Sequence, residues 1–97
     1  MTVKAYLQIT MDIPQQNRGK AAQVYTEYKE TFLNTIPGAE TKQLLVRDED
    51  VQVLHGFDSV NHAQDYLESE LFTQHVFPAL QPTWTSDPEV RIFKVEG

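Results

Sequence analysis

The sequence predicts an α+β domain of the ferredoxin-like order β-α-β-β-α-β, in which two helices cover one face of a four-stranded antiparallel sheet. Three observations predict it. Some segments have apolar residues at every second position, which is typical of strands, and others have them at every third or fourth position, which is typical of helices. Proline, glycine and acidic turn signals separate these segments. The 97 residues, 40% of them hydrophobic, suffice for a single domain over residues 1–97.

The first two elements are a strand and a long helix. Strict alternation over residues 3–13 predicts a half-buried strand whose apolar face carries Val3, Ala5, Leu7, Ile9, Met11 and Ile13. Pro14 ends this strand. Between residues 15 and 36 the period becomes helical, and one stripe carries Ala21, Val24, Tyr25, Tyr28, Phe32 and Ile36. The run Ile36-Pro37-Gly38 predicts the end of the helix, because proline blocks its continuation and glycine permits the turn.

Two strands joined by an acidic turn follow the helix. Residues 39–47 and 51–57 are expected to be extended, and Asp48-Glu49-Asp50 forms the polar turn between them. The fourth strand is expected over residues 89–97, after a loop that contains Trp84. These segments complete the sheet.

The second helix is expected to be broken. It begins near Val60, and either Asp58 or Ser59 can cap its N-terminus. The polar residues 68–70 mark the break. A further helical piece is limited by two prolines, Pro78 and Pro82, and carries Leu71, Phe72, Val76 and Leu80 on its apolar side.

Composition excludes several classes of function. The net charge is −6, with 14 acidic against 8 basic residues, so binding to nucleic acid or to an anionic membrane is not expected. The absence of cysteine excludes disulfides, thiolate nucleophiles and Cys-ligated zinc. No segment approaches the ~20 apolar residues of a membrane span, and the first residues lack the pattern of a signal peptide. We therefore expect a cytoplasmic protein.

Apolar residues on both faces of the sheet predict a homodimer. A sheet covered on one face should alternate cleanly between apolar and polar residues. The last strand instead has Val90 and Ile92 on one side and Phe93 and Val95 on the other. Leu44 and Val46 likewise oppose Leu45, and Tyr6 interrupts the polar side of the first strand. Two sheets packed face to face would bury the apolar residues of the uncovered side. The alternative is that these residues are scattered surface apolars, as on many monomers.

The three histidines fall between residues 55 and 75 but are not expected to converge on a metal. His62 and His75 are thirteen positions apart, which is ~20 Å along a continuous helix. His62 lies among polar residues and is expected at the surface. His55 shares the parity of Val53 and Phe57, so it faces the helices. It is either a core residue or the best candidate for acid–base chemistry, since a buried imidazole is neutral and can accept a proton.

At this level the chain resembles the antibiotic-biosynthesis-monooxygenase-like domains of the dimeric α+β barrel superfamily. The resemblance rests on the order of the elements, on the length, on "IPGA" after the first helix and on "GFDSVNHAQDYLESELF". Members show an aromatic residue at the end of the third strand, then an acid and a serine, and then a helix with a Leu-x-Ser-x-x-Phe element. These positions are filled here by Phe57, Asp58, Ser59, Leu67, Ser69 and Phe72.

The resemblance implies a homodimer whose two sheets form a barrel, with a pocket in each subunit between sheet and helices. Several members oxidise small polycyclic aromatic substrates with O2 and no metal or organic cofactor, and a related branch binds and degrades haem. This chain departs from the active members in having Phe57 in place of a tryptophan and Leu71 in place of a histidine. It has Val76 where haem-degrading members have the iron-ligating histidine, and His75 is one position short of it.

The sequence therefore predicts a monooxygenase-like protein for a small aromatic or quinol ligand, with no cofactor and no metal site, and leaves open whether it is an enzyme. The catalytic candidates are His55 as the base and Tyr66 as a hydrogen-bonding phenol at a position that often faces the pocket in relatives. The candidates for binding the ligand are Phe57, Tyr28, Phe72, His75 and Trp84. The alternatives are a ligand-binding dimer without chemistry and haem binding through His55 or His75.

Overall fold

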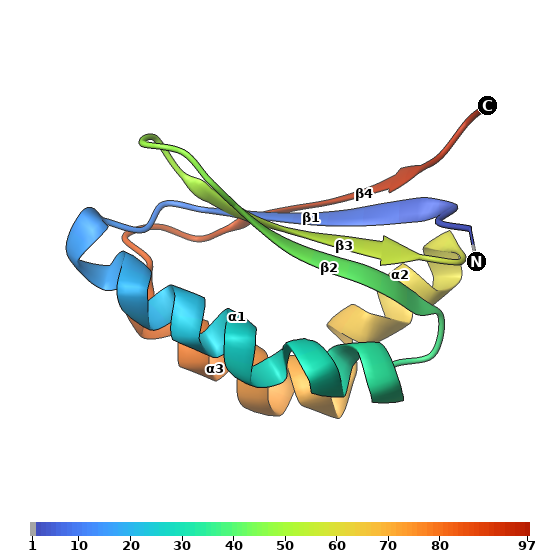
Figure 1. Ribbon diagram of the computed structural model, residues 1–97, viewed down its shortest axis with the longest axis horizontal. Coiled ribbons are helices and arrows are strands. Elements are labelled where there is room, and N and C mark those ends of the chain that lie inside the picture. The colour runs from blue at the N-terminus through green and yellow to red at the C-terminus, as the bar shows by residue number, and fades with distance from the viewer. Residues whose placement is uncertain (1) are drawn as a thin grey trace.

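The computed structural model describes residues 2–97 as a sheet with helices on one side (Figure 1). In chain order, the strands and helices are β1 (Ala5–Met11), α1 (Gln15–Thr35), β2 (Ala39–Val46), β3 (Val51–Phe57), α2 (Val60–Leu67), the π-helix η1 (Leu71–Val76), α3 (Phe77–Leu80), the 3₁₀ turn η2 (Gln81–Thr83) and β4 (Glu89–Lys94). The predicted order β-α-β-β-α-β is confirmed, with the second helical region divided into short pieces.

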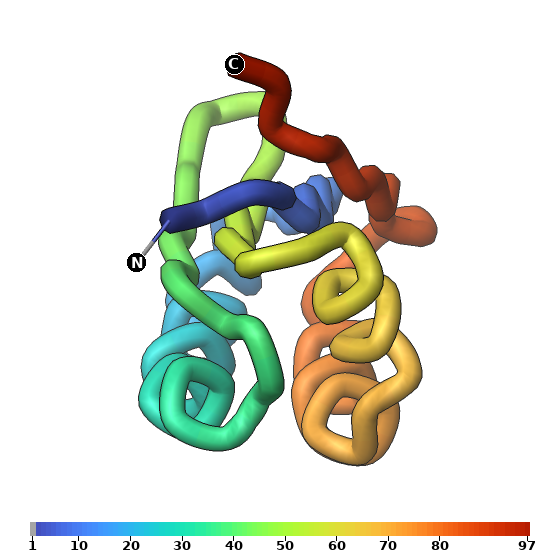
Figure 2. Tube along the Cα trace, turned by 90° about the vertical axis from the view of Figure 1, so that its right-hand side faces the viewer, coloured from blue at the N-terminus to red at the C-terminus, as the bar shows by residue number. Residues whose placement is uncertain are grey.

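The four strands form one antiparallel sheet in the order β2-β3-β1-β4. Figure 2 shows two helical columns beneath this sheet, one made by α1 and the other by the segments that follow β3, and no helix above it. This is the ferredoxin-like arrangement that the sequence predicts, and it leaves the upper face of the sheet uncovered within residues 2–97.

The alternation of β1 builds the core. Ala5, Leu7, Ile9 and Met11 are all buried against the helices, whereas the residues between them are half-buried on the other face. Leu7 lies opposite His55 in β3, and Ile9 lies opposite Val53. The pairing register therefore carries the apolar face of β1 directly into β3, and it places His55 among core residues.

A left-handed glycine terminates the turn after α1. Gly38 has φ 78°, a conformation that glycine adopts without steric cost. Its α-carbon also lies so close to Asp58 and His62 that a Cβ would collide with both side chains. Glycine is therefore required at position 38 for two reasons: the backbone conformation there is left-handed, and the side chains of Asp58 and His62 leave no room for a Cβ.

The second helical region begins at a serine cap and widens before a proline. Ser59 Oγ accepts a hydrogen bond from the backbone N–H of His62 at 3.1 Å, so Ser59 and not Asp58 is the N-cap of α2. In η1 the N–H of Phe77 bonds to the carbonyl of Phe72, five residues earlier. An α-helical turn here would meet the ring of Pro78, which also lacks an N–H. The wider π turn avoids this conflict, and the sequence did not predict it.

The uncovered face of the sheet is partly apolar, as expected. Leu45, Phe93 and Val95 are 42%, 49% and 41% exposed, and Phe93 is paired with Tyr6 of β1. A hollow of about 450 Å³ runs across this face between Gln8, Gln52 and Arg91. Among residues 2–97, no helix is both long and apolar enough to cross a membrane.

Candidate functional site

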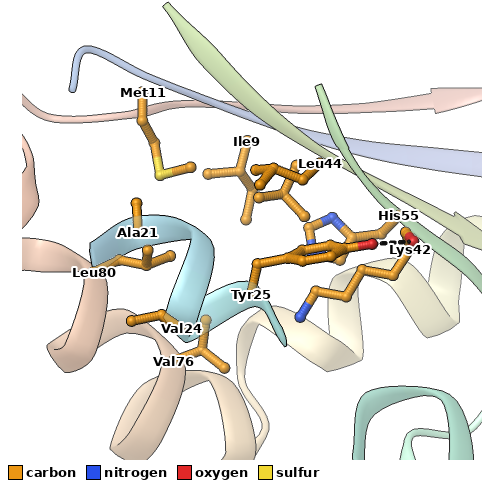
Figure 3. A pocket seen from close by; sticks show the side chains of 11 residues that line it. Ile9, Met11, Ala21, Val24, Tyr25, Lys42, Leu44, His55, Val76 and Leu80 are labelled. Carbon is orange, nitrogen blue, oxygen red and sulfur yellow. Dashed lines mark hydrogen bonds between the residues drawn. The ribbon is translucent and has the colours of Figure 1, made fainter. Parts of the chain in front are cut away.

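A small pocket lies between the sheet and the helices, as the resemblance implied. β1, β2 and β3 form its roof, and α1, η1 and α3 form its floor (Figure 3). It is lined by Ile9, Met11, Ala21, Val24, Tyr25, Lys42, Leu44, Val53, His55, Val76 and Leu80. The volume that the centre of a water molecule can occupy inside the pocket is only about 20 Å³. The total empty volume, which includes the open space in front of the pocket, is about 400 Å³. The closed pocket thus has room for one water molecule, and any larger ligand must displace side chains.

Two of the lining residues are nearest to solvent. Tyr25 and Leu44 are half-buried, and every other lining residue is buried. The Tyr25 hydroxyl donates a 2.7 Å hydrogen bond to the backbone carbonyl of Lys42, which ties α1 to the edge strand β2. Figure 3 shows Tyr25, Lys42 and His55 together at one end of the pocket and Met11, Ala21 and Leu80 at the other. The polar end and the apolar end are therefore separate.

His55 faces the helices, as its parity predicted, and it lines the pocket. It is 2% exposed, and its Nδ1 lies 3.1 Å from the carbonyl oxygen of Leu7. A carbonyl only accepts, so Nδ1 carries the proton of the neutral ring and Nε2 keeps its lone pair. Burial, together with the charge of Lys42, lowers the pKa of His55 to about 3. At neutral pH this residue is an uncharged imidazole that accepts hydrogen bonds through Nε2.

Lys42 is a pocket residue that the sequence analysis missed. It lies opposite His55 in the β2–β3 pairing and is only 4% exposed. Its Nζ lies 5.1 Å from the centre of the Phe32 ring and 5.8 Å from that of Tyr25. Burial, and secondarily the charge of Lys29, lowers the pKa of Lys42 to about 8. The alternation of β2 could have predicted this position, because Lys42 is two residues from the inward-facing Leu44 and therefore points to the same side of the strand.

Three of the predicted aromatic candidates form a cluster around Phe32. The ring centre of Phe32 is 4.9 Å from that of Tyr66 and 5.6 Å from that of Phe57, and Tyr66 is 5.3 Å from Phe72. Tyr66 also contacts His55, with ring centres 5.4 Å apart. This cluster lies beside the pocket and does not line it. The contact of Tyr66 with His55 is the point at which the cluster adjoins the pocket.

The Tyr66 hydroxyl is the most unusual polar atom of this cluster. The residue is 1% exposed, and its hydroxyl has no hydrogen-bond partner among residues 2–97. Burial raises the pKa of the phenol well above its ordinary value, so it stays protonated. An unpaired buried hydroxyl costs about 1–3 kcal/mol of stability, which a ligand or a water molecule could offset.

The other candidates lie at the periphery. His75 is exposed on η1, with its ring 6.2 Å from the half-buried Tyr28. Trp84 packs edge-on against Phe77 at 5.0 Å, and its buried Nε1 has no partner within residues 2–97. His62 is at the surface, where it pairs with Asp58 at 2.6 Å, and this bond raises the pKa of the imidazole. None of these residues lines the pocket.

The three histidines do not approach one another. His55 is in the core, His62 is at the start of α2 and His75 is on the surface of η1. In the part of the chain that the structure describes, no group of three or more histidines and carboxylates could hold a metal ion. Each histidine therefore has to be interpreted separately.

The comparisons with known proteins concern the fold. No family model matches the sequence, and no curated protein matches it significantly. Solved structures match over nearly the whole chain. A protein of Bordetella bronchiseptica assigned as an antibiotic biosynthesis monooxygenase matches with a TM-score of 0.84 and 10% identity, over 98% of this chain and 99% of that one. A similarly assigned protein of Caulobacter crescentus matches with a TM-score of 0.82 and 14% identity, over 98% and 92%.

A third structure contains a ligand. The monooxygenase ActVA-Orf6 of Streptomyces coelicolor, in complex with Nanaomycin D, matches with a TM-score of 0.81 and 12% identity, over 98% of this chain and 89% of that one. Identities this low establish a shared fold and nothing finer. The chain therefore has, over its full length, the fold of the antibiotic biosynthesis monooxygenase structures, which confirms at the level of the fold the resemblance carried by its motifs.

Proposed function

We propose that the protein binds a small aromatic or quinol ligand between sheet and helices and oxidises it with O2, without a metal or an organic cofactor. The observation that carries the proposal is the neutral imidazole of His55, which is buried and lines an otherwise mostly apolar pocket. A protein of the same fold binds an aromatic ligand, Nanaomycin D. Oxidation of a phenol directly by O2 requires a base that takes the phenolic proton and an apolar site that excludes water. The pocket supplies both.

In this reaction His55 accepts the phenolic proton, and the electron-rich anion then reduces O2. An imidazole whose pKa is about 3 is a weak base in the empty pocket. A phenolate formed beside it would offset the cost of the imidazolium, because opposite charges attract strongly where water is excluded. Tyr66, whose ring packs on His55, holds a proton that it could donate to an oxygen of a ligand that reaches past His55.

The small free volume restricts the size of the ligand. About 20 Å³ accommodates O2 or water, and a single aromatic ring requires Tyr25 and Leu44 to rotate outward. Both are half-buried and adjoin solvent, and the rotation of Tyr25 breaks its hydrogen bond to the carbonyl of Lys42. We therefore expect a single-ring quinol to bind more readily than a hydroxylated anthracene.

Oxygen uptake tests the proposed reaction. With a hydroquinone or a hydroxylated anthracene, the wild-type protein is expected to consume O2 faster than buffer. His55→Gln is expected to lower this rate by roughly 10²–10⁴, which is the usual contribution of a general base. His62→Gln is the matched control, because His62 is at the surface and outside the pocket. Uptake that survives in His55→Gln, with the variant folded by circular dichroism, would contradict the role of His55.

The second candidate is a ligand-binding protein without chemistry. The closed pocket, the low basicity of His55 and the replacement of the expected tryptophan and histidine by Phe57 and Leu71 all favour it. Absence of oxygen uptake together with saturable binding of the same hydroquinone would select this candidate over the first.

The residues present do not fit haem. Val76, at the position of the iron-ligating histidine in haem-degrading relatives, faces the pocket and has no ligating atom. His75 is exposed on the surface of η1. His55 is buried with about 20 Å³ of free space beside it, which leaves no room for a porphyrin.

The uncovered face of the sheet supports a homodimer. Its apolar residues Leu45, Phe93 and Val95 and the adjoining Tyr6 would be buried by a second sheet packed face to face. A standard interface removes about 800 Å² from each partner, which a four-stranded face can supply. Dimer formation would also stabilise a domain this small.

Replacing Phe93 by glutamate is expected to separate the dimer. The substitution places a charge where the sheets would meet, and a buried unpaired charge is strongly unfavourable. Wild-type protein at micromolar concentration should sediment at twice the 11.2 kDa mass of the chain, and Phe93→Glu at the mass of one chain. Val90→Glu is the control, because Val90 is 43% exposed on the helix-covered side of β4. A wild-type particle of 11.2 kDa would refute the homodimer.

A further inference from the structure

The polar end of the pocket contains one charged side chain with no opposite charge. Lys42 is the single residue among the lining residues that carries a charge at neutral pH, since His55 is neutral. The ion pairs among residues 2–97 do not include Lys42. Glu40, two positions earlier on β2, neither pairs with Lys42 nor finds a hydrogen bond for its buried Oε1. A buried ammonium in such surroundings is costly.

The groups that face Lys42 explain how it is tolerated but do not neutralise it. From α1, the rings of Tyr25 and Phe32 approach the Nζ atom to within 5.8 and 5.1 Å, which allows weak cation–π attraction. Lys29, also on α1, is close enough to repel it. From β3, His55 supplies a neutral ring that cannot gain a proton easily next to a cation. The polar end of the pocket is thus electropositive and lacks an anion.

We propose that Lys42 is the anchor for an anionic oxygen on a small aromatic ligand, so that the pocket takes phenols and aromatic acids in their ionised form. The proposal rests on the ligand pocket of the proposed function and deepens it by naming the ionisation state of the ligand. The ring of the ligand would pack on the apolar wall of Ile9 and Val53, and its oxygen would lie at the Nζ atom. Two charges brought together in a site that excludes water attract far more strongly than in solution.

The competing interpretation is that Lys42 only covers core rings with its aliphatic stem. Long basic side chains commonly bury the stem and bring the charged end to the nearest polar surroundings. That interpretation requires no ligand, and it predicts that phenol binding is indifferent to the charge at position 42. The two interpretations therefore differ in a measurable property of a bound phenol, its pKa.

The test uses 4-nitrophenol, whose ionised form is yellow. Its absorbance is titrated below pH ~8, with and without excess protein, so that Lys42 stays protonated. Bound to the wild type, the probe should have a pKa lower by roughly 1–3 than in free solution, the effect of an opposite charge at close range. Lys42→Met should abolish this shift, and Lys42→Arg should keep at least part of it. Lys29→Met is the matched control and should keep most of it, because this substitution removes the same charge from α1 but Lys29 does not line the pocket.

Three results would overturn the proposal. The first is a probe pKa that rises on binding to the wild type, as an uncharged apolar pocket would cause. The second is the same shift in the wild type and in folded Lys42→Met, which would leave Lys42 a packing role. The third is no saturable binding of the probe to the wild type. Oxygen uptake is measured separately. A Lys42-dependent shift of the probe pKa without oxygen uptake would support the anion site and refute the proposed reaction. Oxygen uptake without the shift would support the reaction and refute the anion site.

Discussion

Between about pH 8 and about pH 5, the protein is expected to lose about 2 kcal/mol of unfolding free energy through His55 alone. The folded state holds this imidazole neutral, because burial and Lys42 lower its pKa to about 3 from an ordinary value of 6.5. The unfolded chain binds the proton as soon as the pH falls below 6.5. Stability is therefore intact above 6.5 and decreases continuously as the pH falls towards 3.

Urea unfolding at several pH values measures this loss. His55→Leu cannot titrate at this position, so its stability should not fall over the same range. The carboxylates with lowered pKa, Asp50 and Asp58, lose their contribution only below their ordinary value of 3.8, outside this range. His62 acts in the opposite sense, because its raised pKa makes protonation favourable to the folded state. A His62→Asn variant should therefore lose stability at least as steeply as the wild type. Equal slopes for the wild type and His55→Leu would show that His55 is not buried in the neutral form.

Lys42→Met is expected to stabilise the protein by up to roughly 3 kcal/mol at neutral pH. The lowering of the lysine pKa from 10.5 to about 8 is the free energy that the charged form loses on folding. Methionine has a similar length, fills the same space between Tyr25 and Phe32 and carries no charge. A gain of stability from removing a residue in a pocket is typical of groups kept for function.

The pH dependence of the unfolding free energy is the control for the Lys42→Met prediction. Above pH 8 the folded protein releases the Lys42 proton while the unfolded chain keeps it up to 10.5, so wild-type stability should rise through this window. The advantage of Lys42→Met should shrink over the same window. Lys42→Arg stays charged throughout, so it should remain destabilised and show no such rise. A Lys42→Met variant no more stable than the wild type at neutral pH would mean that the ammonium is well solvated in the folded state.

Much of the fold could be predicted from local patterns. The alternation of β1, the stop signal at Gly38 and the break after α2 lie where the sequence placed them, within one or two residues at most strand and helix ends. Each depends on the chain near that position, since side-chain period and turn chemistry are local properties. The π-helix η1 was not predicted, because its wider hydrogen bonds depend on how Pro78 and the packing beneath it are accommodated together.

The site was predicted in part. The parity of β3 placed His55 on the helix-covered face, and the structure brings it to the pocket. Phe57 and Tyr66 are buried on that side but pack on Phe32 beside the pocket, and neither lines it. Lys42 was missed because a lysine on an edge strand is ordinarily solvated, and only the cover by Tyr25 and Phe32 makes this one different.

The sequence by itself determined which side of β1 and of β3 faces the helices, because successive side chains along a strand point to opposite faces of the sheet. It thereby determined the fold class and the inward position of His55. Only the tertiary structure decided that Lys42 is buried beside His55 without an opposite charge and that the pocket closes to about 20 Å³. These properties arise where β2, β3 and α1 meet. The distances between these segments depend on how they pack, and a local sequence pattern contains no information about packing between segments far apart in the chain.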